Sequence, residues 1–383
     1  MLNLDSMRTD KNQAQKASTE AAYLALLRYA LWGGTFPALP EDLTAILQLA
    51  SRQATRGLIY DALLREGAGI PREKTVPMQQ LLIQTYATHQ RLEAGIQRIF
   101  PALEQAGIPA VLIKGQGVAR NYPDPKLREC GDIDIYIGPE QFEESLRTLT
   151  PLADRVDDHL FGKHWQLWVG GCEAELHLYS LEPEWRRDRR FYRQLETEGF
   201  SRGLIPLDFN GIRVDTPEPT FNAFYLFYHL WHHFIVGGVG LRQICDWTLH
   251  LHTRQADIDR ERLREMVEGM RLLGPWQLLG CIAVHDLGLP EAEFPLYDGS
   301  AMARSRLLLD IILAEGNFGK DNESRKNRPE GYLGRKLNSL SSYFYRLRQM
   351  WRIDPRQARS DFAGVTLAGI RRFFRDQSAK RSR

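Results

Sequence analysis

Cysteines are few in this sequence, and none stands in a spacing typical of a metal site. The chain of 383 residues has 4 cysteines. They lie far apart, with no pair separated by two residues: Cys130, Cys172, Cys245 and Cys281. This distribution excludes the cysteine-ligated zinc proteins and the small disulfide-stabilised proteins. We therefore expect reduced thiols and a cytoplasmic location.

Long uninterrupted apolar runs are also missing. The N-terminal stretch MLNLDSMRTDKNQAQKASTE has no apolar core of the kind found in signal peptides. The most apolar segment, residues 221–241, is interrupted by an asparagine, three histidines and a pair of glycines. It predicts a buried helix and no transmembrane segment. The formal net charge of +2 excludes a globally basic nucleic-acid-binding protein but leaves local patches open.

What the chain does have is a helical pattern on both sides of a short region of strand patterns. We expect an α+β fold, in which a small mixed sheet is flanked by N- and C-terminal helical regions. The predicted division is a disordered tail at 1–17, a helical region at 18–107, an α/β core at 108–216 and a helical region with a basic tail at 217–383.

The segment GDIDIYI, residues 131–137, alternates strictly between two kinds of side chain. Its isoleucines share one face of the predicted strand, and Asp132 and Asp134 share the other. Aspartate is rare in strands, and neighbouring carboxylates repel each other. A divalent cation would compensate the two charges.

A second alternating segment, CEAELHLYS, presents Glu173, Glu175 and His177 on one face. It forms one arm of a predicted hairpin that turns at two adjacent glycines. If this strand neighbours the aspartate strand, three acids converge in one cleft, and hard oxygen ligands favour Mg²⁺. The alternation permits either glutamate as the third acid. His177 would either contact substrate or hydrogen-bond its neighbours.

Upstream, the segment IKGQG follows a short apolar strand. Gly115 and Gly117 would let backbone amides approach an anion closely, and Lys114 would add a positive charge. Arg128, just before the aspartate strand, would add another. We interpret these four residues as a phosphate-binding set.

Together these segments resemble the uncharacterised nucleotidyltransferase family of the DNA-polymerase-β-like superfamily. The resemblance covers roughly residues 20–250 and rests on four motifs: Ile113-Lys114-Gly115, Tyr122-Pro123-Asp124-Pro125, the run from Arg128 to Asp134, and Glu175-Leu176-His177-Leu178. The chain departs from the pattern at Gln116, where the superfamily has a serine whose hydroxyl meets the nucleotide phosphate. It departs again at Leu178, where an aromatic residue is common.

The resemblance implies a nucleotidyltransferase sheet and a Mg²⁺-dependent transfer of a nucleoside monophosphate from a nucleoside triphosphate to a hydroxyl acceptor. Asp132 and Asp134 would hold two Mg²⁺ ions, and Glu175, favoured over Glu173 by the motif, would share one of them. ATP or another triphosphate would be the co-substrate. The resemblance does not name the acceptor.

Three histidines, His229, His232 and His233, crowd one face of the apolar helix. His229 and His233 with Asp246 could instead form a metal site of a hydrolase, although no accompanying acid–base motif is present. Arg242 and Asp246 stand four residues apart and would either form a helix ion pair or face the active site. We place His177, His233, Arg242 and Asp246 on the substrate side.

Two further alternatives stay open. A degenerate transferase fold would bind nucleotide without turnover, or the helices would serve as a scaffold.

The C-terminal segment GIRRFFRDQSAKRSR is basic, and it would be either a solvated tail or a contact for an acidic partner, RNA or a membrane surface.

Overall fold

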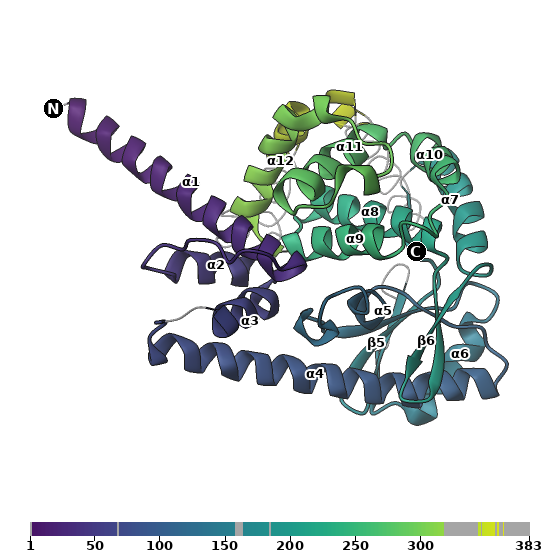
Figure 1. Ribbon diagram of the computed structural model, residues 1–383. Helices are drawn as coiled ribbons and strands as arrows, with labels where there is room; N and C mark the ends of the chain where they lie inside the picture. Colours follow the sequence, from purple (N-terminus) through teal and green to yellow (C-terminus); the bar gives the residue numbers. More distant parts are fainter. Residues whose placement is uncertain are drawn as a thin grey trace, which may run out of the picture.

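The computed structural model describes residues 2–66, 69–157, 164–183, 185–317, 344–345, 347–356, 358–359 and 363, and Figure 1 shows the path of the chain. The α-helices are α1 (Leu2–Trp32), α2 (Thr44–Arg52), α3 (Arg56–Glu66), α4 (Arg72–Gln105), α5 (Gly115–Ala119), α6 (Phe142–Leu149), α7 (Arg186–Gly199), α8 (Pro219–Val236), α9 (Leu241–Thr253), α10 (Arg260–Gly269), α11 (Leu273–Cys281) and α12 (Met302–Glu315). The strands are β1 (Val111–Leu112), β2 (Asp132–Tyr136), β3 (Arg155–Val156), β4 (His164–Val169), β5 (Cys172–His177), β6 (Ile205–Phe209) and β7 (Ile212–Thr216). The predicted α+β class is confirmed.

The N-terminal helices precede the sheet, as the sequence predicted. Helix α1 also runs through residues 2–17, where we expected a disordered tail. The segment KNQAQKAS consists mostly of residues with good helix propensity, and this favours continuation of the helix. Its N-terminal end extends away from the other helices (Figure 1). The basic segment 369–383 lies outside the described residues.

The described strands form one mixed seven-stranded sheet in the order β3-β4-β5-β2-β1-β7-β6. β2 pairs in parallel with β5 and antiparallel with β1, while β1 pairs in parallel with β7. The predicted hairpin is present as β4 and β5, which turn at Gly170 and Gly171.

The two faces of the sheet differ in chemistry because the central strands alternate. Ile133 and Ile135 of β2 are buried in an apolar cluster with Leu92, Ile96 and Ile99 of α4. The opposite face carries the acids. Figure 1 shows α4 along one side of the sheet and the helical layer of α8 and α9 on the other. The acidic face is therefore the one that meets the C-terminal helices.

The hairpin of β6 and β7 was not predicted. Its turn residues Asn210 and Gly211 both have positive φ, 54° and 87°, as a two-residue hairpin turn requires. An Asn-Gly pair between alternating residues is a strong hairpin signal, so the sequence contained the information. β7 extends the sheet beside β1.

Helix α8 is the apolar segment that we expected to be a buried helix. Its residues Phe224, Phe227 and Trp231 are fully buried in the larger apolar cluster. Within the part of the chain that the structure describes, no helix has the length and apolar character needed to cross a membrane.

Candidate active site

The carboxylates of two neighbouring strands form the centre of the candidate active site. In the parallel pairing of β2 with β5, Asp132 lies opposite Glu173 and Asp134 opposite Glu175. Oxygen atoms of Asp132, Asp134 and Glu175 all lie within 4.8 Å of one another. The predicted convergence of three acids is therefore present. Their catalytic and metal-binding roles stay predictions.

The charges of this cluster are unevenly compensated. Asp134, together with burial, raises the pKa of Asp132 to about 6. Burial alone would raise the pKa of Asp134 as well, but Lys114 and His177 outweigh it and hold that pKa below its usual range. Asp132 is thus the carboxylate of this cluster that protonates most easily, since the pKa values of Asp134 and Glu175 are both lowered.

Lys114 is directed at the carboxylates. Its Nζ lies 2.7 Å from Asp134 Oδ1, at a turn where Lys114 and Gly115 both have positive φ, 57° and 43°. A positive φ is uncommon for a side chain such as lysine. Glycine is needed at position 117 for a different reason, because a Cβ there would meet the Thr216 methyl at 3.2 Å. Gly117 therefore allows α5 to pack on the sheet, and the predicted role in approaching an anion rests on Gly115.

His177 hydrogen-bonds its neighbours, one of the two outcomes that we left open. It is buried, and its Nε2 lies 2.9 Å from Asp134 Oδ1 and 3.4 Å from Glu175 Oε2. His164 of β4 also lies beside Glu175, with 3.5 Å between Nε2 and Oε1. Gln166 donates to Glu173 at 2.8 Å and to Glu175 at 3.2 Å. The two glutamates are thus held by the same amide.

Arg128 lies in a second, buried cluster. Its Nε and Nη2 donate to the two oxygens of Asp246 at 2.7 and 2.8 Å, and its Nη1 donates to Cys130 Sγ. Tyr122 also donates to Asp246, at 2.6 Å, and the Arg128 carbonyl lies 2.7 Å from His89 Nε2. The guanidinium and the carboxylate are both buried. The interpretation of Arg128 as a phosphate-binding residue is not supported by this geometry, because its donors already serve the fold.

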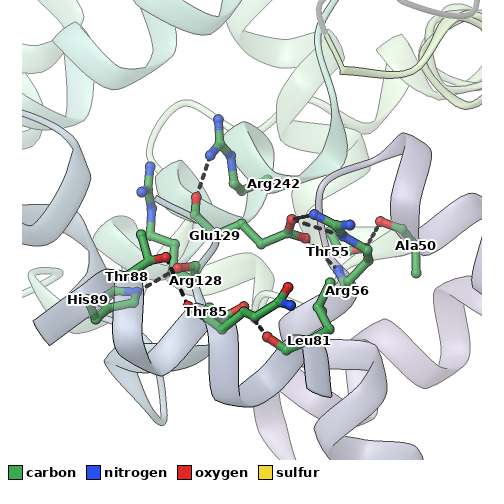
Figure 2. Close-up of polar contacts among 11 residues, drawn as sticks. Ala50, Thr55, Arg56, Leu81, Thr85, Thr88, His89, Arg128, Glu129 and Arg242 are labelled. Carbon is green, nitrogen blue, oxygen red and sulfur yellow. Dashed lines mark hydrogen bonds and ion pairs between the residues drawn. The ribbon is translucent and has the colours of Figure 1, made fainter. Parts of the chain in front are cut away.

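Arg242 takes a place that the sequence did not indicate. It donates to the backbone carbonyl of Glu129, and the Glu129 side chain accepts from Arg56 Nε at 3.0 Å (Figure 2). The ion pair between Arg242 and Asp246, one of the two alternatives for these residues, is not formed among the described residues, since Asp246 binds Arg128. The positive charge of Arg242 lowers the pKa of Asp132, against the larger effects that raise it. Arg242 is thus an arginine whose charge reaches Asp132.

The proposed hydrolase site on α8 is not formed. His229 and His233 contact each other, with 3.1 Å between their Nε2 atoms, but Asp246 is held by Arg128 and Tyr122. Among the residues that the structure describes, the groups spaced for a metal ion are the three carboxylates and a set made of His164, Glu175 and His177. Neither group contains a histidine of α8.

Sequence reasoning gave no role to three further residues. His164 could have been found, because it faces His177 across the predicted hairpin. Tyr225 of α8 is buried, its hydroxyl has no partner among the described residues, and it lies close enough to Lys114 and Asp134 to feel their charges. Gln116, noted only as a departure from the family pattern, is buried with no partner for either amide atom in the described chain. The helical periodicity of α8 gave no signal for Tyr225.

A protein family and a solved structure are similar to this chain. A family profile described as "Uncharacterised nucleotidyltransferase" matches residues 40–288. No curated protein matches. Among solved structures, an antigenic nucleotidyltransferase-like protein from Paracoccidioides brasiliensis is similar at 14% identity, over 43% of this chain and 78% of that chain, with a TM-score of 0.32.

Proposed function

The chain belongs to the uncharacterised nucleotidyltransferase family, and from this premise we propose a reaction. The chain transfers a nucleoside monophosphate from a nucleoside triphosphate to a hydroxyl acceptor. Mg²⁺ is the cofactor, and pyrophosphate is the second product. The observation that carries the proposal is the pairing of β2 with β5, which brings oxygens of Asp132, Asp134 and Glu175 within 4.8 Å.

The donor set fits a hard divalent cation. All three ligands are carboxylates, which Mg²⁺ prefers over the sulfur and nitrogen ligands that suit zinc. The raised pKa of Asp132 reports repulsion that a bound cation would relieve. Bound Mg²⁺ would lower the pKa of the acceptor hydroxyl and offset the charge of the triphosphate. We assign two ions to the aspartates and a share of one to Glu175.

The chain's own residues prepare this site. His177 and Lys114 fix the Asp134 carboxylate by contacts to its Oδ1, and these two contacts leave the second oxygen unused. Lys114 is a half-buried cation beside the acids and would neutralise phosphate charge, together with the backbone at Gly115. Arg242 replaces Arg128 as the proposed arginine for this role, since Arg128 is bound to Asp246.

The experiment measures pyrophosphate release by the purified chain with each nucleoside triphosphate, Mg²⁺ and a panel of hydroxyl acceptors. The panel contains monosaccharides, nucleosides, short RNA and the protein itself. We expect release above that of Asp132→Asn with at least one pair of substrates. Binding of a non-hydrolysable triphosphate by titration calorimetry, with release no higher than in the variant for every pair, would favour the non-catalytic nucleotide-binding module.

A further inference from the structure

Helix α7 presents a concentration of arginines that the candidate active site does not use. Arg186, Arg190 and Arg193 follow a spacing of four and three residues, which places them on one helix face. With Arg189, Arg202 and Tyr179 they line a surface hollow of about 810 Å³. In a chain with a net charge of only +2, five arginines around one hollow form a strong local field. We call this surface the α7 arginine hollow.

The charge of the hollow is only partly compensated. Arg186, Arg190 and Arg202 are exposed, and no acidic side chain of the described chain pairs with any of the three. Among the described residues that line the hollow, the one acid is Glu198, and it also lies 3.5 Å from Arg262. The hollow therefore keeps an excess of positive charge that an anion can reach.

The other two arginines are held in place. Arg193 Nη1 lies 2.7 Å from Glu196 Oε2, and its guanidinium stacks over the Tyr179 ring at 3.5 Å. Arg189 donates to the Pro183 carbonyl at 3.2 Å. Arginine held flat against an aromatic ring gives a rigid planar surface beside the free guanidinium groups.

The hollow is anchored to the sheet that carries the acids. Tyr179 follows His177 by two residues, and Phe200 at the end of α7 stacks on Tyr136 of β2 with 4.0 Å between the ring centroids. Tyr136 shares the sheet face of Asp132 and Asp134 by strand alternation. The C-terminal end of α7 therefore contacts the sheet on the face of the acids.

We infer that the α7 arginine hollow binds single-stranded nucleic acid. Guanidinium groups pair with phosphate oxygens in bidentate geometry, and a stacked arginine and tyrosine offer a surface for bases. Apart from Tyr179, the side chains between the arginines are Gln194, Thr197 and Glu198. They include no aliphatic group that would insert into a bilayer or anchor a peptide, and this favours a nucleic acid over a membrane surface or an acidic peptide.

The test is fluorescence anisotropy of a short labelled single-stranded RNA with the full chain, in EDTA and without triphosphate. The combined variant Arg186→Gln/Arg190→Gln/Arg202→Gln removes the three free charges. We expect at least about a 10-fold loss of affinity at low salt. The slope of log K against log salt should become shallower by about 2, since each phosphate contact on a single strand contributes about 0.7.

The matched control removes three exposed arginines that do not line the hollow: Arg147→Gln/Arg187→Gln/Arg213→Gln. Arg187 lies on α7 itself, so the control tests position as well as charge. It should bind within about twofold of wild type, and circular dichroism melts should show that both variants fold. No binding by wild type, equal losses in the two variants, or tighter binding to anionic vesicles or to a polyglutamate peptide would overturn the inference.

The inference does not depend on the proposed transfer reaction. Asp132→Asn should bind the RNA as wild type does, because Asp132 does not line the hollow. A chain that binds RNA and releases no pyrophosphate would overturn the proposed function alone. A chain that releases pyrophosphate and binds no RNA would overturn this inference alone.

Discussion

The Lys114 ammonium lies 2.7 Å from Asp134 Oδ1, in the interior of the candidate active site. The lysine side chain is 16% exposed and the aspartate side chain 4%. Burial would lower the pKa of Lys114, but the Asp134 carboxylate outweighs it and the pKa is raised. A resident cation therefore holds the acidic cluster together before any metal binds.

Removing this cation should destabilise the chain in a metal-dependent way. Lys114→Met leaves the buried Asp134 carboxylate without its ion pair, a loss that typically costs about 3–5 kcal/mol. Urea unfolding in EDTA should show this loss of stability. Mg²⁺ should restore part of the stability by supplying positive charge to the same cluster. Lys74→Met is the control, because Lys74 pairs with an Asp42 that is mostly exposed; this variant should unfold at nearly the same urea concentration as wild type. A Lys114→Met chain as stable as wild type would contradict the role of counter-ion.

The raised pKa of Asp132 predicts an unusual dependence of stability on pH. Its folded pKa of about 6 lies above the ordinary value of 3.8, so between these values the folded state holds a proton that the unfolded state has lost. Protonated Asp132 therefore favours the folded state over the unfolded state relative to the ionised form. This contribution to the free energy of unfolding is fully present below about pH 4 and is lost as the pH rises through 6. The pKa of Asp134 is lowered, so its contribution to stability has the opposite dependence on pH. That contribution changes only at pH values below about 4.

Unfolding free energies measured in EDTA from pH 4 to pH 7 test this expectation. The difference between Asp132→Asn and wild type should grow in favour of the variant by about 2–3 kcal/mol, since one pKa unit corresponds to about 1.36 kcal/mol. Mg²⁺ should reduce the difference above pH 6. A flat difference across the range would show that Asp132 ionises normally.

The elements of the site were predictable from the sequence because they follow local alternation. Residues 131–137 and 173–177 showed which side chains share a face, and the structure pairs these two segments. The role of Arg128 could not be predicted, because its partner Asp246 is 118 residues away. A lone arginine before an acidic strand looks the same whether it binds phosphate or a buried aspartate. The partner is decided by how α9 packs on the sheet, and local sequence does not encode that packing.

The histidines beside Glu175 predict inhibition by zinc. His164, Glu175 and His177 offer two nitrogens and one oxygen within 4.8 Å, a set that suits Zn²⁺. Zinc bound there would withdraw Glu175 from the three carboxylates. In a transfer assay with excess Mg²⁺, micromolar Zn²⁺ should inhibit wild type. The same inhibition of His164→Ala should require a Zn²⁺ concentration at least about 10-fold higher. His252→Ala, whose histidine contacts Glu293 elsewhere, should behave as wild type. Equal inhibition of all three chains would place the zinc site elsewhere.

The two glutamates of β5 should differ sharply in their effect on transfer. Glu175 lies opposite Asp134 and belongs to the carboxylate group, whereas Glu173 lies outside that group. Glu175→Gln should lower kcat by at least about 10²-fold, the scale of losing a positioned catalytic group. Nucleotide affinity should change far less. Glu173→Gln should stay within a few-fold of wild type, and the reverse ranking would move the third ligand to Glu173.

Arg128 and Arg242 should separate stability from substrate binding. Arg128→Gln leaves Asp246 buried without its partner, so the free energy of unfolding should fall by about 3–5 kcal/mol. Arg242→Gln removes a half-buried cation that bonds only a backbone carbonyl in the described chain and whose charge acts on Asp132. We expect it to raise the KM for the triphosphate by about 10-fold or more while costing about 1 kcal/mol or less in unfolding. Urea titrations and initial rates on the two variants decide between the roles. If Arg128→Gln instead folds normally and loses triphosphate binding, Arg128 would regain the phosphate role that its motif suggested, and the pairing with Asp246 would have to open when substrate binds.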